Sequence, residues 1–318
     1  MFVIIFTFSF LVTMLIFPGI ISRLKKVDIV GINMNSKNKE TIPEMGGLVT
    51  LIGLAGGLIL CIGLKSFLDF FPNVNLYLLF AALATILIVV IVGIMDDLFS
   101  VSQGVKAILP ALAAIPLMAL KAGDSTMNFF FFGFIDFGIF YPLVLIPLGV
   151  TGASNAINML AGFNGLETGM GIIALSSLAV IAYQVQEMTS LVLLLAGLGA
   201  LLATLYFNWY PAKVLIGDVG AMGIGAVMAS AVIIGNFEMA GCILIIPHVI
   251  DLLFKAQNGF PKSFGEYCEG KLYCPGNKPV GLAQWIMKIS GGIKEKNLVL
   301  TLMGIELIFA VITLILYI

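Results

Sequence analysis

The chain has 318 residues, of which 60% are hydrophobic and only 10% are charged, with a mean hydropathy of +1.13 and a formal net charge of −1. Soluble domains carry about 25% charged residues, so this composition excludes an ordinary soluble protein and predicts a polytopic membrane protein. The near-neutral charge, without a basic tail or a low-complexity segment, gives no reason to expect nucleic acid as a partner.

The first apolar stretch, from Met1 to Ile21, lacks the basic flank and the small-residue cleavage site of a signal peptide. We therefore predict that it is a retained spanning helix. A membrane span needs about 20 mostly apolar residues. Ten such runs are found, at 1–22, 45–64, 75–95, 105–121, 138–154, 169–185, 189–207, 219–235, 239–255 and 297–317.

These runs predict an all-α membrane protein with one domain over residues 1–318 and two longer polar loops, at about 23–44 and 255–296. Fourteen of the 16 basic residues fall in loops after odd-numbered helices, and only Lys65 and Lys121 fall after even-numbered ones. The positive-inside rule then places both long loops in the cytoplasm and both termini outside.

The most polar stretch within the apolar part of the chain runs from Ser154 to Gly169, directly after the apolar residues 139–150. It holds three asparagines, a glutamate and three glycines. Carboxamides can bind a hydroxyl, a base edge or a hard cation, and glycines let the backbone approach a ligand. Asn and Gly are equally the usual residues of an interhelical turn, so this stretch alone leaves both readings open.

Two further acidic positions fall at the same predicted cytoplasmic ends. Asp96 and Asp97 are adjacent carboxylates that repel each other unless a cation offsets them, and Lys106 follows nine residues later. A divalent metal that binds phosphate oxygens would offset this repulsion. Alternatively, one aspartate could cap the next helix. Asp218 opens a glycine-rich helix and fits a helix cap, a metal ligand or a catalytic acid. Because ionisable groups at membrane depth are costly, we expect one shared site.

Other candidates have simpler explanations. Glu44, in P-E-M-G-G, is ordinary chemistry for a helix start. A lone histidine, His248, cannot build a metal site. Cys268 and Cys274 share a loop but lack zinc-site spacing, and the four cysteines are too scattered for a disulfide framework.

Four segments together resemble the polyprenyl-phosphate N-acetylhexosamine-1-phosphate transferases. They are P-E-M-G-G at 43–47, the Asp pair with Lys106, N-A-I-N-M-L-A-G-F-N-G-L-E at 155–167, and N-W-Y-P-A-K-V-L-I-G-D at 208–218. Within that family the chain resembles the archaeal and eukaryotic branch that uses UDP-N-acetylglucosamine and dolichyl phosphate. Bacterial relatives tend to carry aspartates where this chain has Ala161 and Asn164.

The resemblance implies a ten-helix enzyme that transfers a sugar phosphate, with GlcNAc-1-phosphate expected, from a UDP-sugar to a polyprenyl or dolichyl phosphate, as in the first membrane step of N-glycosylation. UMP is released. The implied cofactor is Mg²⁺, with Mn²⁺ as an alternative, and the partners are the two substrates and the bilayer, with a homodimer left open. The short final loop favours an archaeal cell membrane over the endoplasmic reticulum.

The family pattern also implies a role for individual residues. Asp218 and Asn158 would bind Mg²⁺, and Asp96, Asp97 and Lys106 would be catalytic. The residues expected to bind substrate are Glu44, Asn155, Asn164, Gly165, Glu167 and Lys278.

One departure bears on the sugar. Eukaryotic members carry a His- and Arg-rich run after Cys-Pro in the last cytoplasmic loop, whereas this chain has C-P-G-N-K-P at 274–279. Lys278 would replace the sugar-recognition arginine only in part, because lysine lacks the bidentate fork.

We predict that the lipid phosphate attacks the β-phosphorus of the UDP-sugar directly, with Asp97 orienting or deprotonating it. Two other classes stay open from the residues alone. An intramembrane aspartyl protease would use two aspartates at helix ends, and a transporter would use carboxylates and broken helices within the membrane.

Overall fold

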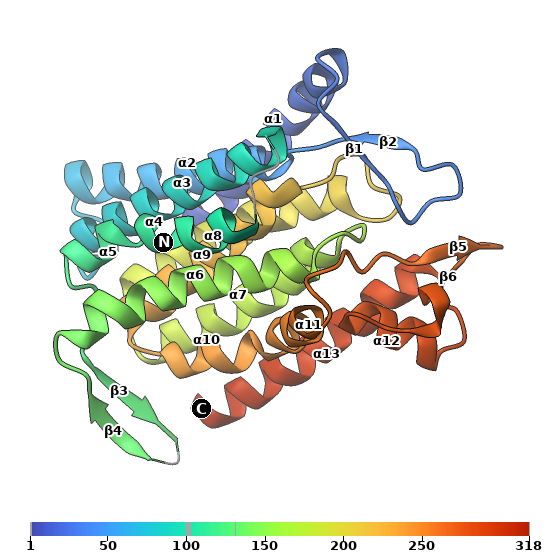
Figure 1. The fold of residues 1–318 in the computed structure, drawn as a ribbon. Helices are drawn as coiled ribbons and strands as arrows, with labels where there is room; N and C mark the ends of the chain where they lie inside the picture. Colours follow the sequence, from blue (N-terminus) through green and yellow to red (C-terminus); the bar gives the residue numbers. More distant parts are fainter. Residues whose placement is uncertain (1, 100–102, 131, 318) are drawn as a thin grey trace.

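The computed structural model describes residues 2–99, 103–130 and 132–317. Most of the chain forms a bundle of roughly aligned helices, with small β-hairpins at its two ends (Figure 1). The longer helices are α1 (Phe2–Lys26), α2 (Gly47–Leu68), α3 (Leu76–Phe99), α6 (Ile146–Leu160), α7 (Leu166–Gln184), α8 (Met188–Asn208), α9 (Gly217–Gly235) and α13 (Glu295–Tyr317). The shorter ones are α4 (Gln103–Ala113), α5 (Ile115–Ala119), α10 (Glu238–Leu244), α11 (Ile246–Gln257) and α12 (Leu282–Ile289), with a π-helix η1 (Tyr141–Leu145) and a 3-10 helix η2 (Pro275–Asn277).

The prediction of a helical membrane protein is confirmed, while the count of ten spans stays a prediction. Among the described residues, eight helical segments are long and apolar enough to cross a membrane, counting η1 and α6 together as Tyr141–Leu160. The pair α10 and α11 could form a ninth span, but it is bent by 57°. Apolar composition predicted each of these segments, but it did not predict the bend between α10 and α11.

The fourth predicted span, 105–121, is divided into α4 and α5. Pro110 lies inside α4, and Pro116 lies at the start of α5. Proline lacks the N–H that would continue the helical ladder, and its ring clashes with the carbonyl four residues earlier. This run is therefore not the single span-length helix that its apolar composition predicted.

The structure adds three two-stranded antiparallel hairpins to the predicted all-α fold. The hairpin of β1 (Val30–Ile32) and β2 (Thr41–Pro43) lies in the predicted loop 23–44. The loop 255–296 contains α12 and the hairpin of β5 (Glu266–Cys268) and β6 (Lys271–Tyr273), and the third hairpin joins β3 (Thr126–Phe129) to β4 (Gly133–Asp136). Strands of three or four residues are too short to show a periodic pattern in the sequence.

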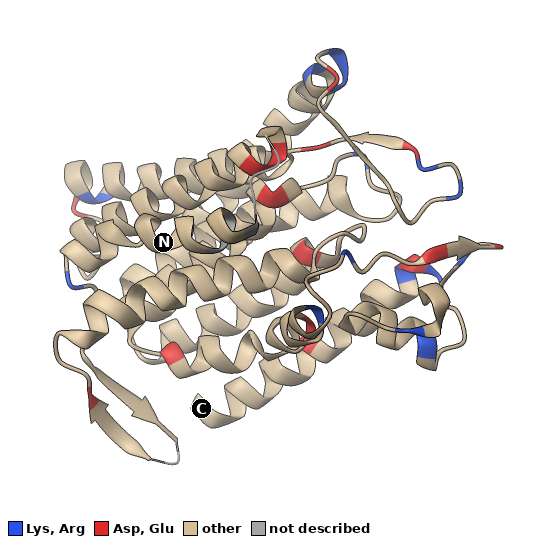
Figure 2. Cartoon of the chain, viewed as in Figure 1, with Lys and Arg blue, Asp and Glu red and all other residues tan. Residues whose placement is uncertain are grey.

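Basic residues gather at the end of the bundle that carries β1, β2, β5 and β6 (Figure 2). The start of α1 and the end of α13 point toward the opposite end (Figure 1). This arrangement agrees with the segregation of charge that the loops predicted.

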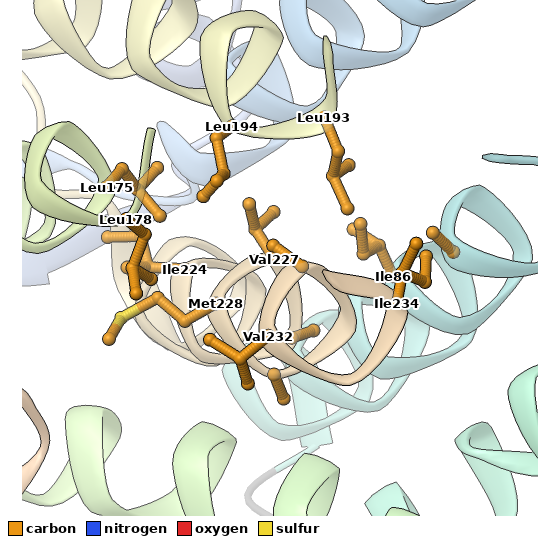
Figure 3. Close-up of a cluster of buried hydrophobic side chains, with 14 of the residues drawn as sticks. Ile86, Leu175, Leu178, Leu193, Leu194, Ile224, Val227, Met228, Val232 and Ile234 are labelled. Atoms are coloured by element: carbon orange, nitrogen blue, oxygen red, sulfur yellow. The ribbon is translucent and has the colours of Figure 1, made fainter. Parts of the chain in front are cut away.

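Helix α9 is the centre of the bundle. Every residue from Val219 to Gly235 is buried, and α9 packs against α2, α3, α6, α7 and α8. Figure 3 shows the apolar side chains at its meeting with α3, α7 and α8, which include Ile86, Leu175, Leu194 and Val227.

Small residues let the neighbouring helices approach α9 at backbone distance. A Cβ added to Gly47 of α2 would lie 2.2 Å from the backbone nitrogen of Gly220, and one added to Gly93 of α3 would lie 2.8 Å from the Cα of Val219. A Cβ on Gly225 would lie 2.6 Å from the carbonyl carbon of Ala153 in α6. Because lipid is as apolar as leucine, such close packing is a main source of helix association in membranes.

We predict that Gly47→Ala destabilises the protein, because the new methyl group meets backbone that cannot rotate away. Overpacking of this kind costs about 1–3 kcal/mol. The matched control is Gly63→Ala in the same helix, where an added Cβ meets nothing within 4 Å. Thermal unfolding in detergent should show a lower midpoint for Gly47→Ala only, and equal midpoints would contradict this account of the α2–α9 contact.

Candidate active site

A cavity of about 540 Å³ lies where segments that are far apart in the sequence meet. Its walls come from the β1–β2 region, the end of α3, the link between α6 and α7, the start of α9 and the segment after α11. Seven of the predicted site residues line it: Glu44, Asp96, Asp97, Asn158, Asn164, Glu167 and Asp218. The structure therefore brings together residues from all four motifs on which the resemblance rests.

The other four predicted residues do not add to the described lining. Asn155 faces back along α6 and donates a hydrogen bond from Nδ2 to the carbonyl of Thr151, 2.9 Å away. Gly165 packs against Trp209, whose Cε3 would lie 2.8 Å from an added Cβ. Lys278 is exposed and lies outside the cavity lining. The side chain of Lys106 lies outside the part of the chain that the structure describes.

Asp97 joins the end of α3 to the start of α9. Its Oδ1 accepts a hydrogen bond from the backbone N–H of Asp218 at 2.9 Å, and its Oδ2 accepts one from Val219 at 3.4 Å. The first N–H groups of a helix have no partner within the helix, and the helix dipole favours a negative charge there. Asp97 therefore caps α9 from another helix.

This contact requires glycine at position 217. The backbone there has φ +68°, and an added Cβ would lie 2.4 Å from Oδ2 of Asp97. Gly217 thus lets α9 begin directly beneath the Asp97 carboxylate, and it sets where Asp218 stands at the cavity.

Glu44 faces the cavity from the segment between β2 and α2. It lies over Gly31 of β1, where an added Cβ would come within 2.8 Å of the Glu44 carboxyl carbon. Burial and the negative charge of Asp218 raise the pKa of Glu44, and the nearby Lys262 opposes this shift.

The loop between α6 and α7 is fixed by two carboxylates. Glu167 accepts a hydrogen bond from the N–H of Gly162 at 2.7 Å, and Glu295 at the start of α13 accepts one from the N–H of Asn164 at 2.9 Å. Asn35 donates to the carbonyl of Gly162 at 2.8 Å. Glu167 and Asn164 were predicted to bind substrate, and the structure shows that they also shape the wall that carries Asn158.

Sequence reasoning missed several groups that line or support this cavity. Lys255 and Lys262 line it, and so does Asn208, which donates to the carbonyl of Val214 at 2.9 Å. Asn35 and Glu295 support its loops from segments more than 120 residues away from the bonded partner. For Lys255 the sequence offered one local signal. Asp251 and Lys255 are four positions apart, which places an acid and a base on one face of a helix, where they can pair.

The residues at the cavity suit a hard cation. The described lining carries five carboxylates and two lysines, with carboxamides but no Cys or His. No group of three or more His, Cys, Asp or Glu in the described chain could hold a metal by itself. Mg²⁺ does not need such a group, because it usually binds one or two carboxylates, waters and substrate phosphates. Asp218 and Asn158 fit that mode of binding.

Comparison with known proteins identifies the family. The model of glycosyl transferase family 4 matches residues 79–236, a range that includes Asp96, Asp97, Asn158 and Asp218. This chain belongs to that family. A putative UDP-N-acetylglucosamine–dolichyl-phosphate N-acetylglucosaminephosphotransferase of Saccharolobus solfataricus is 38% identical, over 97% of this chain and 94% of its own.

More distant relatives point the same way. The UDP-N-acetylglucosamine–dolichyl-phosphate N-acetylglucosaminephosphotransferase of Dictyostelium discoideum is 28% identical, over 81% of this chain and 72% of its own. A probable undecaprenyl-phosphate N-acetylglucosaminyl 1-phosphate transferase of Bacillus subtilis is 30% identical, over 76% of this chain and 65% of its own. The resemblance noted in the motifs is confirmed, the chain is an integral membrane protein, and the protease and transporter alternatives are not supported.

We predict that Gly217→Ala loses turnover beyond what its loss of stability explains, because the added methyl group displaces the Asp97 carboxylate. A left-handed backbone costs an L-residue about 1–2 kcal/mol. The matched control is Gly133→Ala in β4, away from the cavity, where φ is +73° and an added Cβ meets nothing within 4 Å.

Both variants should lose similar thermal stability from backbone strain, and only Gly217→Ala should lose turnover, by about tenfold or more, a barrier increase of about 1.4 kcal/mol. Equal turnover in the two variants would show that the Asp97 contact does not matter for the reaction.

Proposed function

We propose that this protein transfers GlcNAc-1-phosphate from UDP-GlcNAc to a membrane dolichyl or polyprenyl phosphate and releases UMP. The relatives named above support this reaction by their family and by the substrates in their names. The observation that carries the proposal is the convergence of Asp96, Asp97, Asn158 and Asp218 on one cavity. The proposed site lies on the cytoplasmic face of the membrane, which the gathering of basic residues at that end of the bundle supports (Figure 2). The Saccharolobus solfataricus relative supports an archaeal cell membrane as its location.

The reaction joins two negatively charged phosphates, so charge neutralisation and positioning dominate its barrier. Mg²⁺, held by Asp218 and Asn158, would supply Lewis-acid neutralisation of phosphate oxygens. Asp96 lines the same cavity, and Lys106 remains predicted to contact phosphate.

We infer direct displacement. An oxygen of the lipid phosphate forms a bond to the β-phosphorus, and the bond from that phosphorus to the oxygen bridging the α-phosphorus breaks, so its electron pair leaves with UMP. A phosphate monoester has a second pKa near 6 and is largely a dianion at pH 7, so it needs little help from a base.

The two backbone bonds accepted by Asp97 support an orienting role for this residue over a nucleophilic one. A phosphorylated enzyme trapped with UDP-sugar alone would contradict direct displacement.

Asp218→Asn should reduce UMP release from UDP-GlcNAc with a polyprenyl phosphate by roughly 10²–10³, the size of effect seen when one group that stabilises transition-state charge is lost. The control is Asp69→Asn, an exposed aspartate at the left-handed end of α2, where asparagine is well tolerated. A panel of UDP-sugars in the same assay identifies the sugar. Wild-type activity in Asp218→Asn would remove this residue from the mechanism.

Removing divalent metal should abolish UMP release, since the cavity lining carries more carboxylates than lysines and would repel a diphosphate. Chelation followed by dialysis, then addition of Mg²⁺ or Mn²⁺, measures this dependence. Activity should return with Mg²⁺ and with Mn²⁺, and full activity in the chelated enzyme would contradict the metal assignment.

A further inference from the structure

The cavity has a buried positive charge that none of the predicted motifs contains. Lys255, at the end of α11, lines the cavity and is 3% exposed, whereas the other lysine of the described lining, Lys262, is exposed. Burying an ammonium group is costly unless it is paired, so its surroundings need an explanation.

Two partners hold the Lys255 ammonium from different sides. Its Nζ lies 2.8 Å from Oδ2 of Asp251, one helical turn earlier, and Asp251 is fully buried. The same Nζ donates a hydrogen bond to the backbone carbonyl of Met159, the residue that follows Asn158. An ammonium group has three N–H donors. These two contacts use two of them, and the side chain lines the cavity.

Asp251 is itself held in place. Its Oδ1 accepts a hydrogen bond from the N–H of Leu282 at 2.7 Å, at the start of α12. Gly281 lies so close that an added Cβ would come within 2.7 Å of the same oxygen. Asp251 is therefore held by α12, and its carboxylate holds the Lys255 side chain beside the end of α6.

The negative charge of the cavity suggests a second role for Lys255, in addition to its ion pair with Asp251. The described lining holds five carboxylates, and a nucleotide diphosphate would bring further negative charge among them. A buried, oriented ammonium group beside the Asn158 segment opposes that repulsion, and a low local dielectric strengthens its attraction to phosphate.

We propose that Lys255 binds the diphosphate of the nucleotide-sugar and that Asp251 is its positioning residue. This inference rests on the proposed function, because it names a further residue for the same substrate. It also makes the α11–α12 region, which lies outside residues 79–236 of the family match, part of the binding site.

The test compares the binding of UDP and of uridine in the presence of Mg²⁺, measured by calorimetry on the full chain in detergent. Lys255→Met alone leaves the Asp251 carboxylate buried without its cation, which can prevent folding. The decisive variants are therefore Asp251→Asn, which keeps the lysine, and the double variant Asp251→Asn with Lys255→Met, which removes both charges.

A phosphate-binding lysine predicts that Asp251→Asn binds UDP about as tightly as wild type, because the carboxamide oxygen of asparagine still accepts a hydrogen bond from the ammonium group and keeps it in position. The double variant should bind UDP about ten- to a hundredfold more weakly, the range for one hydrogen bond to a charged group. Uridine, which has no phosphate, should bind all three proteins equally. Lys271→Met, at an exposed position of β6, should match wild type throughout.

Other outcomes overturn the inference. Equal UDP affinity in wild type and the double variant would exclude a phosphate contact, and equal losses in both Asp251→Asn and the double variant would assign the pair a structural role only. In either case a wild type that binds UDP and releases UMP leaves the proposed function intact. A wild type that binds no UDP would contradict the proposed function and this inference together.

Discussion

The hydrogen bonds between the Asp97 carboxylate and the first N–H groups of α9 are the contact on which the site depends. They fix the end of α3 against the start of the helix that forms the centre of the bundle. Because α9 is buried along nearly its whole length and meets its neighbours through glycines, its start cannot shift without repacking the core. Asp218 is therefore held at the cavity by the packing of the whole bundle.

Many of the polar groups at this end of the bundle support backbone, and two of them, Glu167 and Lys255, also line the cavity. Glu167 and Glu295 accept hydrogen bonds from the α6–α7 loop, and Lys255 donates to the carbonyl of Met159. In a chain with 10% charged residues, each buried charge needs a partner, and backbone groups at helix ends supply one. The site and the scaffold are thus built from the same side chains.

Sequence reasoning identified the class of protein, the family and seven of the residues that line the cavity, including all five carboxylates of the described lining, because composition and contiguous motifs are local properties. It predicted the helical segments but not the breaks at Ala114, between α4 and α5, and at Ile245, between α10 and α11. It also missed the three hairpins. It also placed Asn155, Gly165 and Lys278 in the substrate site, whereas the structure places them outside the cavity lining. These three residues share a motif or a loop with residues of the cavity, and a shared motif does not determine which way a side chain faces.

The sequence by itself determined that the chain lies in a membrane, that its basic loops fall on one side, and that its acidic and amide residues come in the order of a known transferase family. Only the tertiary structure decided which of those groups meet. Asp97 bonds residues 121 and 122 positions away, and Lys255 bonds one 96 positions away. Contacts at such separations depend on how helices pack across the bundle. The sequence pattern of a single helix does not show which distant residues that helix will contact.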